Sequence, residues 1–79
     1  PMLTVKILGS GCANCKKLEA VAREAAALAQ VEAEFVKVTD MNDILAFNVM
    51  STPALVINDK VVSSGRIPSL ADIQKWLTA

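Results

Sequence analysis

Two cysteines, Cys12 and Cys15, are the residues of this 79-residue sequence whose type and spacing point most directly to chemistry. A thiol–disulfide exchange site needs one accessible thiol that ionises, and a second thiol close enough to release the resulting mixed disulfide. The C-x-x-C spacing supplies both thiols. A purely structural role suits this pair less well, because a bridge between such close residues constrains the unfolded chain very little. The spacing therefore predicts a redox-active pair.

The segments around the cysteines predict a strand, a turn and a long helix. Residues 3–8 alternate apolar and polar side chains, and the turn at residues 9–11 contains two glycines. From residue 13 to about residue 30 the chain is rich in helix-forming residues, with apolar side chains at helical spacing. Cys12 then lies at the helix N-terminus, where free backbone N–H groups and the helix dipole favour a thiolate. Cys15 follows nearly one turn later, in place to resolve a mixed disulfide.

Lys16 and Lys17 follow the cysteine pair directly and add positive charge beside it. This charge would favour the thiolate further if the ammonium groups lie close to the sulfur. Long side chains that extend into solvent would have little effect, because exposed charges interact weakly. The sequence leaves both interpretations open.

The rest of the chain predicts alternating strands and helices. The expected elements are strands over residues 33–38, 54–57 and 61–64, a short helix over residues 41–48, and a last helix that begins after Ser69. Asp40 and Ser69 are suitable N-cap residues for the two later helices. Together these elements predict an α/β fold of βαβαββα order, with a four-stranded mixed sheet flanked by three helices. Residues 1–79 are expected to form a single domain.

Composition narrows the class of partner and the location. Eight basic residues balance eight acidic residues, so the charge gives no reason to expect nucleic acid or an anionic membrane as a partner. No apolar run approaches the roughly 20 residues that span a bilayer, and the start does not resemble a secretory leader. The expected location is cytoplasmic. Pro1 precedes Met2, and nothing further is read from that end.

Two separated motifs give the sequence its family resemblance. Residues 11–16 (Gly-Cys-Ala-Asn-Cys-Lys) follow the first strand, and residues 49–57 (Val-Met-Ser-Thr-Pro-Ala-Leu-Val-Ile) lead into the hairpin. In this order they resemble the small single-domain, redox-active members of the thioredoxin-like superfamily. The resemblance covers nearly the whole chain.

The resemblance implies an enzyme, a thiol–disulfide oxidoreductase that acts in cell redox homeostasis without a bound cofactor other than its own Cys12–Cys15 disulfide. Its substrates would be disulfide-bearing proteins or small thiols, and an upstream reductase would reduce it. The resemblance also implies that the Thr52–Pro53 bond is cis and lies against the cysteines, with the Thr52 backbone contacting an extended partner. The sequence alone favours the trans bond that most X-Pro pairs adopt.

The sequence departs from thioredoxins proper at two positions. Those proteins have a tryptophan just before the first cysteine and a buried carboxylate six residues before it, whereas this chain has Gly11 and Lys6. The proton-transfer role of that carboxylate in thioredoxins proper is therefore not assigned to Lys6. The Ala13–Asn14 pair between the cysteines leaves the redox potential open.

Two other functions compete with exchange. Short metal-carrier domains also place C-x-x-C between a first strand and a first helix, so the same two thiolates of Cys12 and Cys15 could bind a soft metal or metalloid. A closed zinc site within one chain is not expected, since structural zinc takes four protein ligands and the chain has two cysteines and no histidine. A dimer would supply four thiolates, so a shared site stays open. The other alternative is a binding module that keeps the scaffold without turnover.

Overall fold

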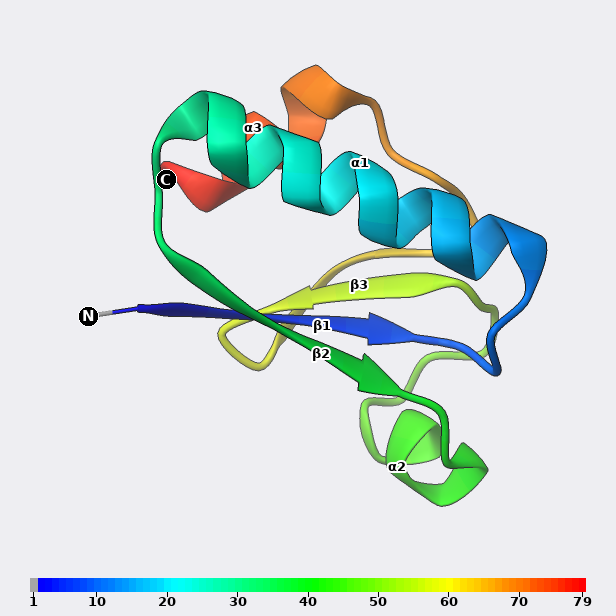
Figure 1. Cartoon of the computed structure of the whole chain (residues 1–79). Coiled ribbons are helices and arrows are strands. Elements are labelled where there is room, and N and C mark those ends of the chain that lie inside the picture. Colours follow the sequence, from blue (N-terminus) through cyan, green and yellow to red (C-terminus); the bar gives the residue numbers. More distant parts are fainter. Residues whose placement is uncertain (1) are drawn as a thin grey trace.

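A computed structural model describes residues 2–79 of the chain. Its elements are β1 (Leu3–Leu8), α1 (Ala13–Ala29), β2 (Ala33–Val38), α2 (Met41–Ala46), β3 (Ala54–Ile57), β4 (Lys60–Ser64) and α3 (Leu70–Leu77). The predicted βαβαββα order is confirmed (Figure 1). Pro1, which belongs to the predicted domain, lies outside the described residues. None of the described helices has the length and apolar character needed to cross a membrane.

The strands form one mixed sheet in the order β2-β1-β3-β4. β1 and β2 are parallel, because α1 carries the chain back along the sheet between them, whereas β3 is antiparallel to both β1 and β4. Leu8 lies beside Val38 on one side and Ala54 on the other, and Ala54 lies opposite Ser64. The ends of β1, β2 and β4 therefore meet the start of β3 at one edge of the sheet.

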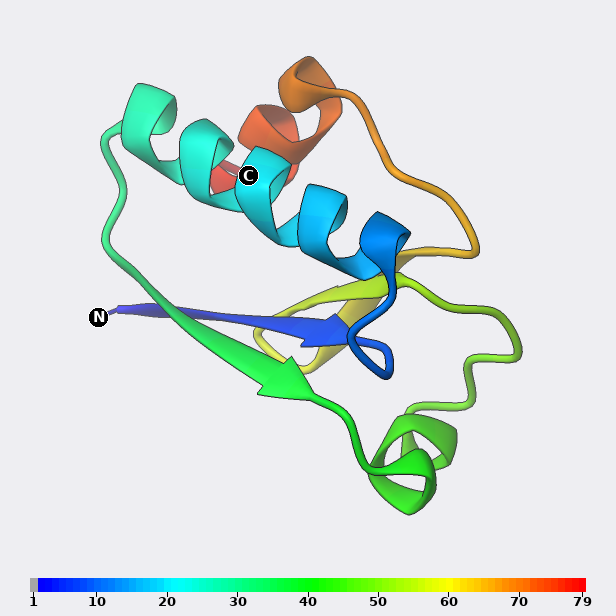
Figure 2. The same cartoon turned by 45° about the vertical axis from the view of Figure 1, so that its right-hand side comes forward.

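Helices cover both faces of the sheet. Figures 1 and 2 show α1 and α3 together on one face and α2 on the other. The larger core, under α1 and α3, contains Val5, Ile7, Leu18, Ala22, Ala25, Ala26, Leu55, Ile57, Ile73 and Leu77. The smaller core, toward α2, contains Leu8, Ile44, Val49, Ala54 and Val56.

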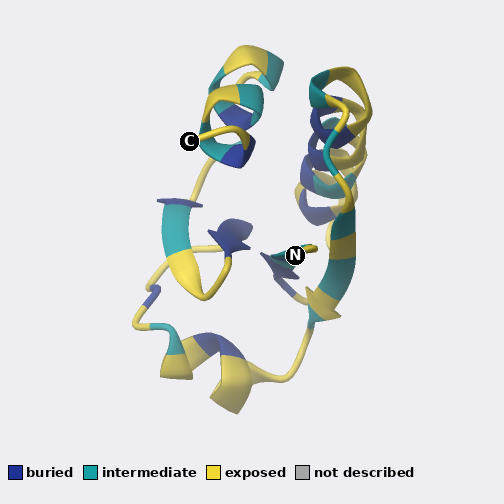
Figure 3. Cartoon of the chain, turned by 90° about the vertical axis from the view of Figure 1, so that its left-hand side faces the viewer, coloured by how far each residue is buried: buried dark blue, intermediate teal, exposed yellow. Residues whose placement is uncertain are grey.

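The two cores follow from side-chain alternation along the strands. In β3, Leu55 and Ile57 point toward α1 and α3, while Ala54 and Val56 point toward α2, because successive strand residues face opposite sides of a sheet. Every residue of β3 is therefore buried. Figure 3 shows the buried surface on the inner side of α1, with the exposed residues turned outward.

Local side chains begin the two later helices as the sequence predicts. The Asp40 carboxylate accepts a hydrogen bond from the N–H of Asn42 at 2.8 Å, and the Ser69 hydroxyl accepts one from the N–H of Asp72 at 3.1 Å. Each cap satisfies a backbone N–H that has no partner within the helix, and is typically worth about 1 kcal/mol.

Two element boundaries differ from the prediction. α2 ends at Ala46 rather than at residue 48, and the chain turns away at Asn48, which has a left-handed φ of 62°. The hairpin turn contains only Asn58 and Asp59, with φ of 49° and 66°, so β4 begins at Lys60. A two-residue turn with positive φ at both positions matches the twist of a hairpin, and Asn and Asp tolerate that conformation.

Candidate dithiol site

Three loops meet at the edge of the sheet where β1 ends. Residues 9–12 connect β1 to α1, residues 47–53 lead into β3, and residues 65–69 follow β4. The pairing of β3 with β1 and β4 places these loops side by side, next to the N-terminus of α1 (Figure 2). The two motifs singled out in the sequence, residues 11–16 and 49–57, thus come together only in the folded chain.

Cys12 is the N-cap residue of α1. Its backbone is extended, with φ of −68° and ψ of 167°, and its Sγ accepts a hydrogen bond from the N–H of Cys15 at 3.2 Å. The side chain is exposed and lies at the positive end of the helix dipole. The same N–H and dipole stabilise a thiolate at Cys12 when the pair is reduced.

Cys15 forms a disulfide with Cys12, and their Cα atoms are 5.0 Å apart. Unlike Cys12, it is buried, with 5% of its surface exposed. Gly9 packs directly against it: a Cβ added at Gly9 would overlap the Cys15 Sγ and come 3.4 Å from the Cys15 Cβ. The glycine is therefore required by close packing beneath the disulfide.

Thr52 and Pro53 lie beside the cysteine loop, as the resemblance implies. Their peptide bond is cis. Pro53 is buried and Thr52 is exposed, and a Cβ built on Gly9 would stand 3.9 Å from the Thr52 Cβ. On the other side, the Pro53 carbonyl oxygen accepts a hydrogen bond from the N–H of Gly65 at 2.9 Å. This segment thus fills the space between the ends of β1 and β4.

Lys16 and Lys17 are both exposed on the first turns of α1. Within residues 2–79, neither side chain takes part in an ion pair. Lys16 lines a small pocket beside Cys15, whereas Lys17 does not.

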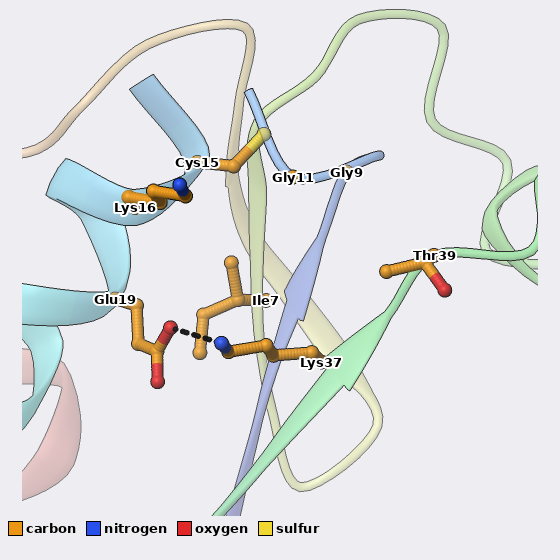
Figure 4. Close-up of a pocket in the computed structure, with 8 residues that line it drawn as sticks. All are labelled: Ile7, Gly9, Gly11, Cys15, Lys16, Glu19, Lys37 and Thr39. Atoms are coloured by element: carbon orange, nitrogen blue, oxygen red, sulfur yellow. Dashed lines mark ion pairs between the residues drawn. The ribbon is translucent and has the colours of Figure 1, made fainter. Parts of the chain in front are cut away.

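The pocket beside Cys15 lies between α1, β1 and β2 and has a volume of about 50 Å³ (Figure 4). Its wall includes Glu19, which pairs with Lys37 at 3.2 Å and with Arg23 at 3.0 Å. Desolvation raises the pKa of the Glu19 carboxyl, but hydrogen bonds and charges from Lys37 and Arg23 outweigh it and hold the pKa below its usual value. Glu19 is therefore an anion that pairs with Lys37 in the wall of this pocket and with Arg23 one turn further along α1.

Only the helical half of this arrangement has a local signal in the sequence. The four-residue spacing of Glu19 and Arg23 indicates an ion pair on one helix. Lys37 comes from β2, and no local pattern connects it with Glu19. Lys6, at the position where thioredoxins proper have a carboxylate, instead points to Asp59, with a 3.1 Å ion pair.

The surroundings of Cys12 and Cys15 bear on the metal-binding alternative. In the described part of the chain, no group of three or more His, Cys, Asp or Glu side chains is arranged to hold a metal ion. The metal-binding alternative therefore depends on Cys12 and Cys15 alone.

Comparison with known proteins assigns the family. A family model described as a thioredoxin domain matches residues 3–78. The chain belongs to the thioredoxin family. The paired cysteines, the neighbouring Thr52–Pro53 segment and the helix that begins at Cys12 are thus features of a thioredoxin-family protein.

Two relatives of similar length support this assignment. The thioredoxin of Methanothermobacter thermautotrophicus is 38% identical over 77 residues, which cover 98% of this chain and 100% of that protein. The thioredoxin of Methanocaldococcus jannaschii is 36% identical over 76 residues, which cover 96% of this chain and 87% of that protein. Like them, this thioredoxin-family protein is a thiol–disulfide oxidoreductase.

Solved structures confirm the fold. Thioredoxin-2, described as a component of the malaria parasite protein secretion machinery, superposes with a TM-score of 0.67 at 19% identity. Oxidised thioredoxin from Plasmodium falciparum gives a TM-score of 0.60 at 17% identity. In both cases the match covers 98% of this chain and 82% of the other. The four-stranded mixed sheet with three helices is therefore the thioredoxin fold.

Proposed function

We propose that Cys12 is the attacking thiol of the oxidoreductase and Cys15 the resolving thiol. The difference in exposure supports this order: Cys12 is open to solvent, whereas only 5% of Cys15 is exposed. A bulky partner disulfide therefore reaches Cys12 first. Cys12 also has the stronger thiolate stabilisation, since its sulfur caps the helix.

The exchange then proceeds in two balanced steps. The Cys12 thiolate attacks one sulfur of the partner disulfide, and the other partner sulfur leaves as a thiolate that takes a proton from water. The deprotonated Cys15 then attacks the Cys12 sulfur of the mixed disulfide. The partner is released with both sulfurs reduced, and the Cys12–Cys15 disulfide remains on the protein.

Thr52 and Pro53 are proposed to hold the backbone of the partner. Thr52 is exposed beside the cysteine loop, and among residues 2–79 its backbone N–H and carbonyl form no hydrogen bond within the chain. An extended partner segment can pair with these free groups as an added strand does. Such pairing would orient the partner disulfide toward Cys12.

Lys16 and Lys17 are proposed to favour the thiolate of Cys12 to a small degree. Both are exposed, and exposed charges interact weakly, so their contribution to the thiol is smaller than that of the helix N-terminus. Lys16, which lines the pocket at Cys15, is the nearer candidate.

The proposed partners are disulfide-bearing proteins or small thiols on one side and a reductase on the other, in the cytoplasm. The C-x-x-C chemistry needs no further bound cofactor for these exchanges, because the electrons move between sulfur pairs. Regular turnover of this kind would contribute to cell redox homeostasis.

Trapping with two serine variants tests the assigned roles. A Cys15→Ser protein should accumulate a mixed disulfide with a disulfide peptide, detected by intact mass, because no second thiol clears the first. A Cys12→Ser protein should form none, while its serine oxygen preserves the helix cap. Trapping by the Cys12→Ser protein instead would reverse the assignment.

An equilibrium redox titration tests the reaction itself. The unaltered protein, equilibrated in thiol–disulfide buffers and alkylated, should lose two thiols reversibly between about −120 and −270 mV, the span of known exchange proteins. Failure to form the Cys12–Cys15 disulfide reversibly would refute the proposed turnover.

A further inference from the structure

We propose that this protein reacts preferentially with disulfides in acidic segments, and that Lys16, Lys17 and Arg66 provide this preference. The inference deepens the proposed function, because it concerns the partner that Cys12 attacks. It rests on the placement of three cations, which form no ion pair among residues 2–79, on the elements around Thr52.

The cations come from two elements that flank the cysteine loop, α1 and the loop after β4. Lys16 and Lys17 occupy the first turns of α1, directly after the cysteines. Arg66 follows Gly65, which is so close to the Thr52 segment that an added Cβ would lie 2.8 Å from the Cβ of Ser51. In both Figures 1 and 2 the loop after β4 passes beside the N-terminal end of α1. A segment bound at Thr52 would therefore pass between cations from α1 and from this loop.

The charges of these cations are free to act on a partner. All three side chains are exposed, and in residues 2–79 none of them forms an ion pair. Lys60 at the opposite hairpin is likewise exposed and outside these ion pairs, which makes it a suitable control.

The carboxylates nearby do not cancel this charge. Glu19, on the same helix as the lysines, is already paired with Lys37 and Arg23. Asp40 and Asp43 belong to the α2 end, on the other face of the sheet (Figure 1). Glu24 on α1 and Asp72 in the first turn of α3 lie outside the ion pairs of residues 2–79. Each lies further from the cysteine loop along its element than the cations do: Glu24 is about two turns beyond Lys17, and Asp72 is six residues beyond Arg66. The α1 and β4–α3 surroundings of Cys12 and Thr52 are therefore positive although the whole chain has a net charge of zero.

The chemistry makes this positive charge useful. The attacking sulfur of Cys12 is an anion, so an acidic partner would be repelled without compensating cations. Each exposed charge pair changes a rate by roughly 1.5- to 5-fold, and three acting together should give about tenfold selectivity at low salt. Because salt screens exposed charges, the selectivity should decline as ionic strength rises.

Three peptides that differ only in charge provide the test. Each contains one cysteine held as a mixed disulfide with 2-mercaptoethanol, flanked by Glu, Gln or Lys residues. The reduced protein is mixed with each peptide, the reaction is quenched by alkylation, and intact mass gives the rate constant of protein oxidation. Dividing by the rate of the same peptide with dithiothreitol removes the effect of the flanking charges on the disulfide itself.

The proposal predicts that the Glu peptide reacts about tenfold faster than the Lys peptide at low salt, and that high salt reduces this ratio at least threefold. The combined Lys16→Gln, Lys17→Gln and Arg66→Gln variant should bring the ratio close to one. The Lys60→Gln control should keep the ratio of the unaltered protein. Use of a ratio separates partner choice from any change in Cys12 reactivity, which affects all peptides equally.

Two results would overturn the proposal. One is a ratio of one or less in the unaltered protein, and the other is a ratio that survives the triple substitution. Both differ from failure of the exchange function, in which even the neutral Gln peptide would not oxidise the protein.

Discussion

The two ends of the sheet use their backbone groups differently. At the hairpin end, Asn58 joins β1 through both its backbone and its side chain: its N–H donates to the Thr4 carbonyl at 2.8 Å, and its Oδ1 accepts from the Thr4 N–H at 2.9 Å. At the cysteine end, the exposed Thr52 backbone forms no hydrogen bond within residues 2–79, and the neighbouring Met50 is 97% exposed.

This contrast shows which end of the sheet has backbone groups free to bind a partner. The hairpin end joins Asn58 to Thr4 by two hydrogen bonds and adds the Lys6–Asp59 ion pair across the strands. The cysteine end is tightly packed underneath, where Gly9 meets Cys15, and open above, at Cys12 and Thr52. Substitutions should therefore affect redox chemistry at the cysteine end and only stability at the hairpin end.

The largest effect is expected from Gly9→Ala. The added Cβ would overlap the Cys15 sulfur, so we expect the oxidised protein to lose about 3 kcal/mol of unfolding free energy, the upper range for overpacking. The reduced protein should lose less, because its Cys15 side chain can rotate away. Urea titrations of both redox forms, followed by Trp76 fluorescence, would measure the difference.

Gly11→Ala is the matched control for that substitution. A Cβ at Gly11 meets no atom within 4 Å, but its φ of 84° disfavours alanine. We expect a loss of about 1 kcal/mol that is equal in both redox forms. Equal losses for the two forms of the Gly9 variant would contradict the packing explanation.

A smaller effect is expected at the hairpin end from Asn58→Ala. The substitution removes the hydrogen bond that the Asn58 Oδ1 accepts from the Thr4 N–H, and it places alanine at a φ of 49°. Together these changes should lower the unfolding free energy by about 2 kcal/mol. Asn58→Gly should recover the part due to backbone conformation. The exchange rate per folded molecule should be unchanged in both variants. A slower rate would contradict the proposal that the hairpin end affects only stability.

The smallest effect concerns acid stability at Glu19. Its folded pKa is below the ordinary value of 4.5, so the stabilisation is present above pH 4.5 and is lost as the pH falls through the lowered folded pKa. Glu19→Gln should therefore flatten the dependence of stability on pH below about 4.5. Urea titrations across this range would show the change, with the exposed Glu24→Gln on the same helix as control. An unchanged acid slope in Glu19→Gln would refute the assigned ion-pair role.

Local signals in the sequence explain what could be predicted. Strand alternation, helical spacing and the caps at Asp40 and Ser69 act over a few residues, so they identified the element order correctly. The errors at the end of α2 and the start of β4 arose because local signals do not record how the chain returns to the sheet. The left-handed turns at Asn48 and at Asn58–Asp59 depend on how the chain must rejoin the sheet, which the polar residue types alone do not specify.

The sequence by itself determined the chemistry available to this protein: two thiols one helical turn apart, at a helix N-terminus that favours a thiolate. Tertiary structure decided how that chemistry is presented. Pairing between strands far apart in the sequence placed Gly9 beneath Cys15, Thr52 beside the cysteine loop and Lys37 against Glu19. These contacts leave Cys12 exposed and Cys15 buried, because sheet pairing and packing set exposure, whereas residue order sets only spacing along the chain.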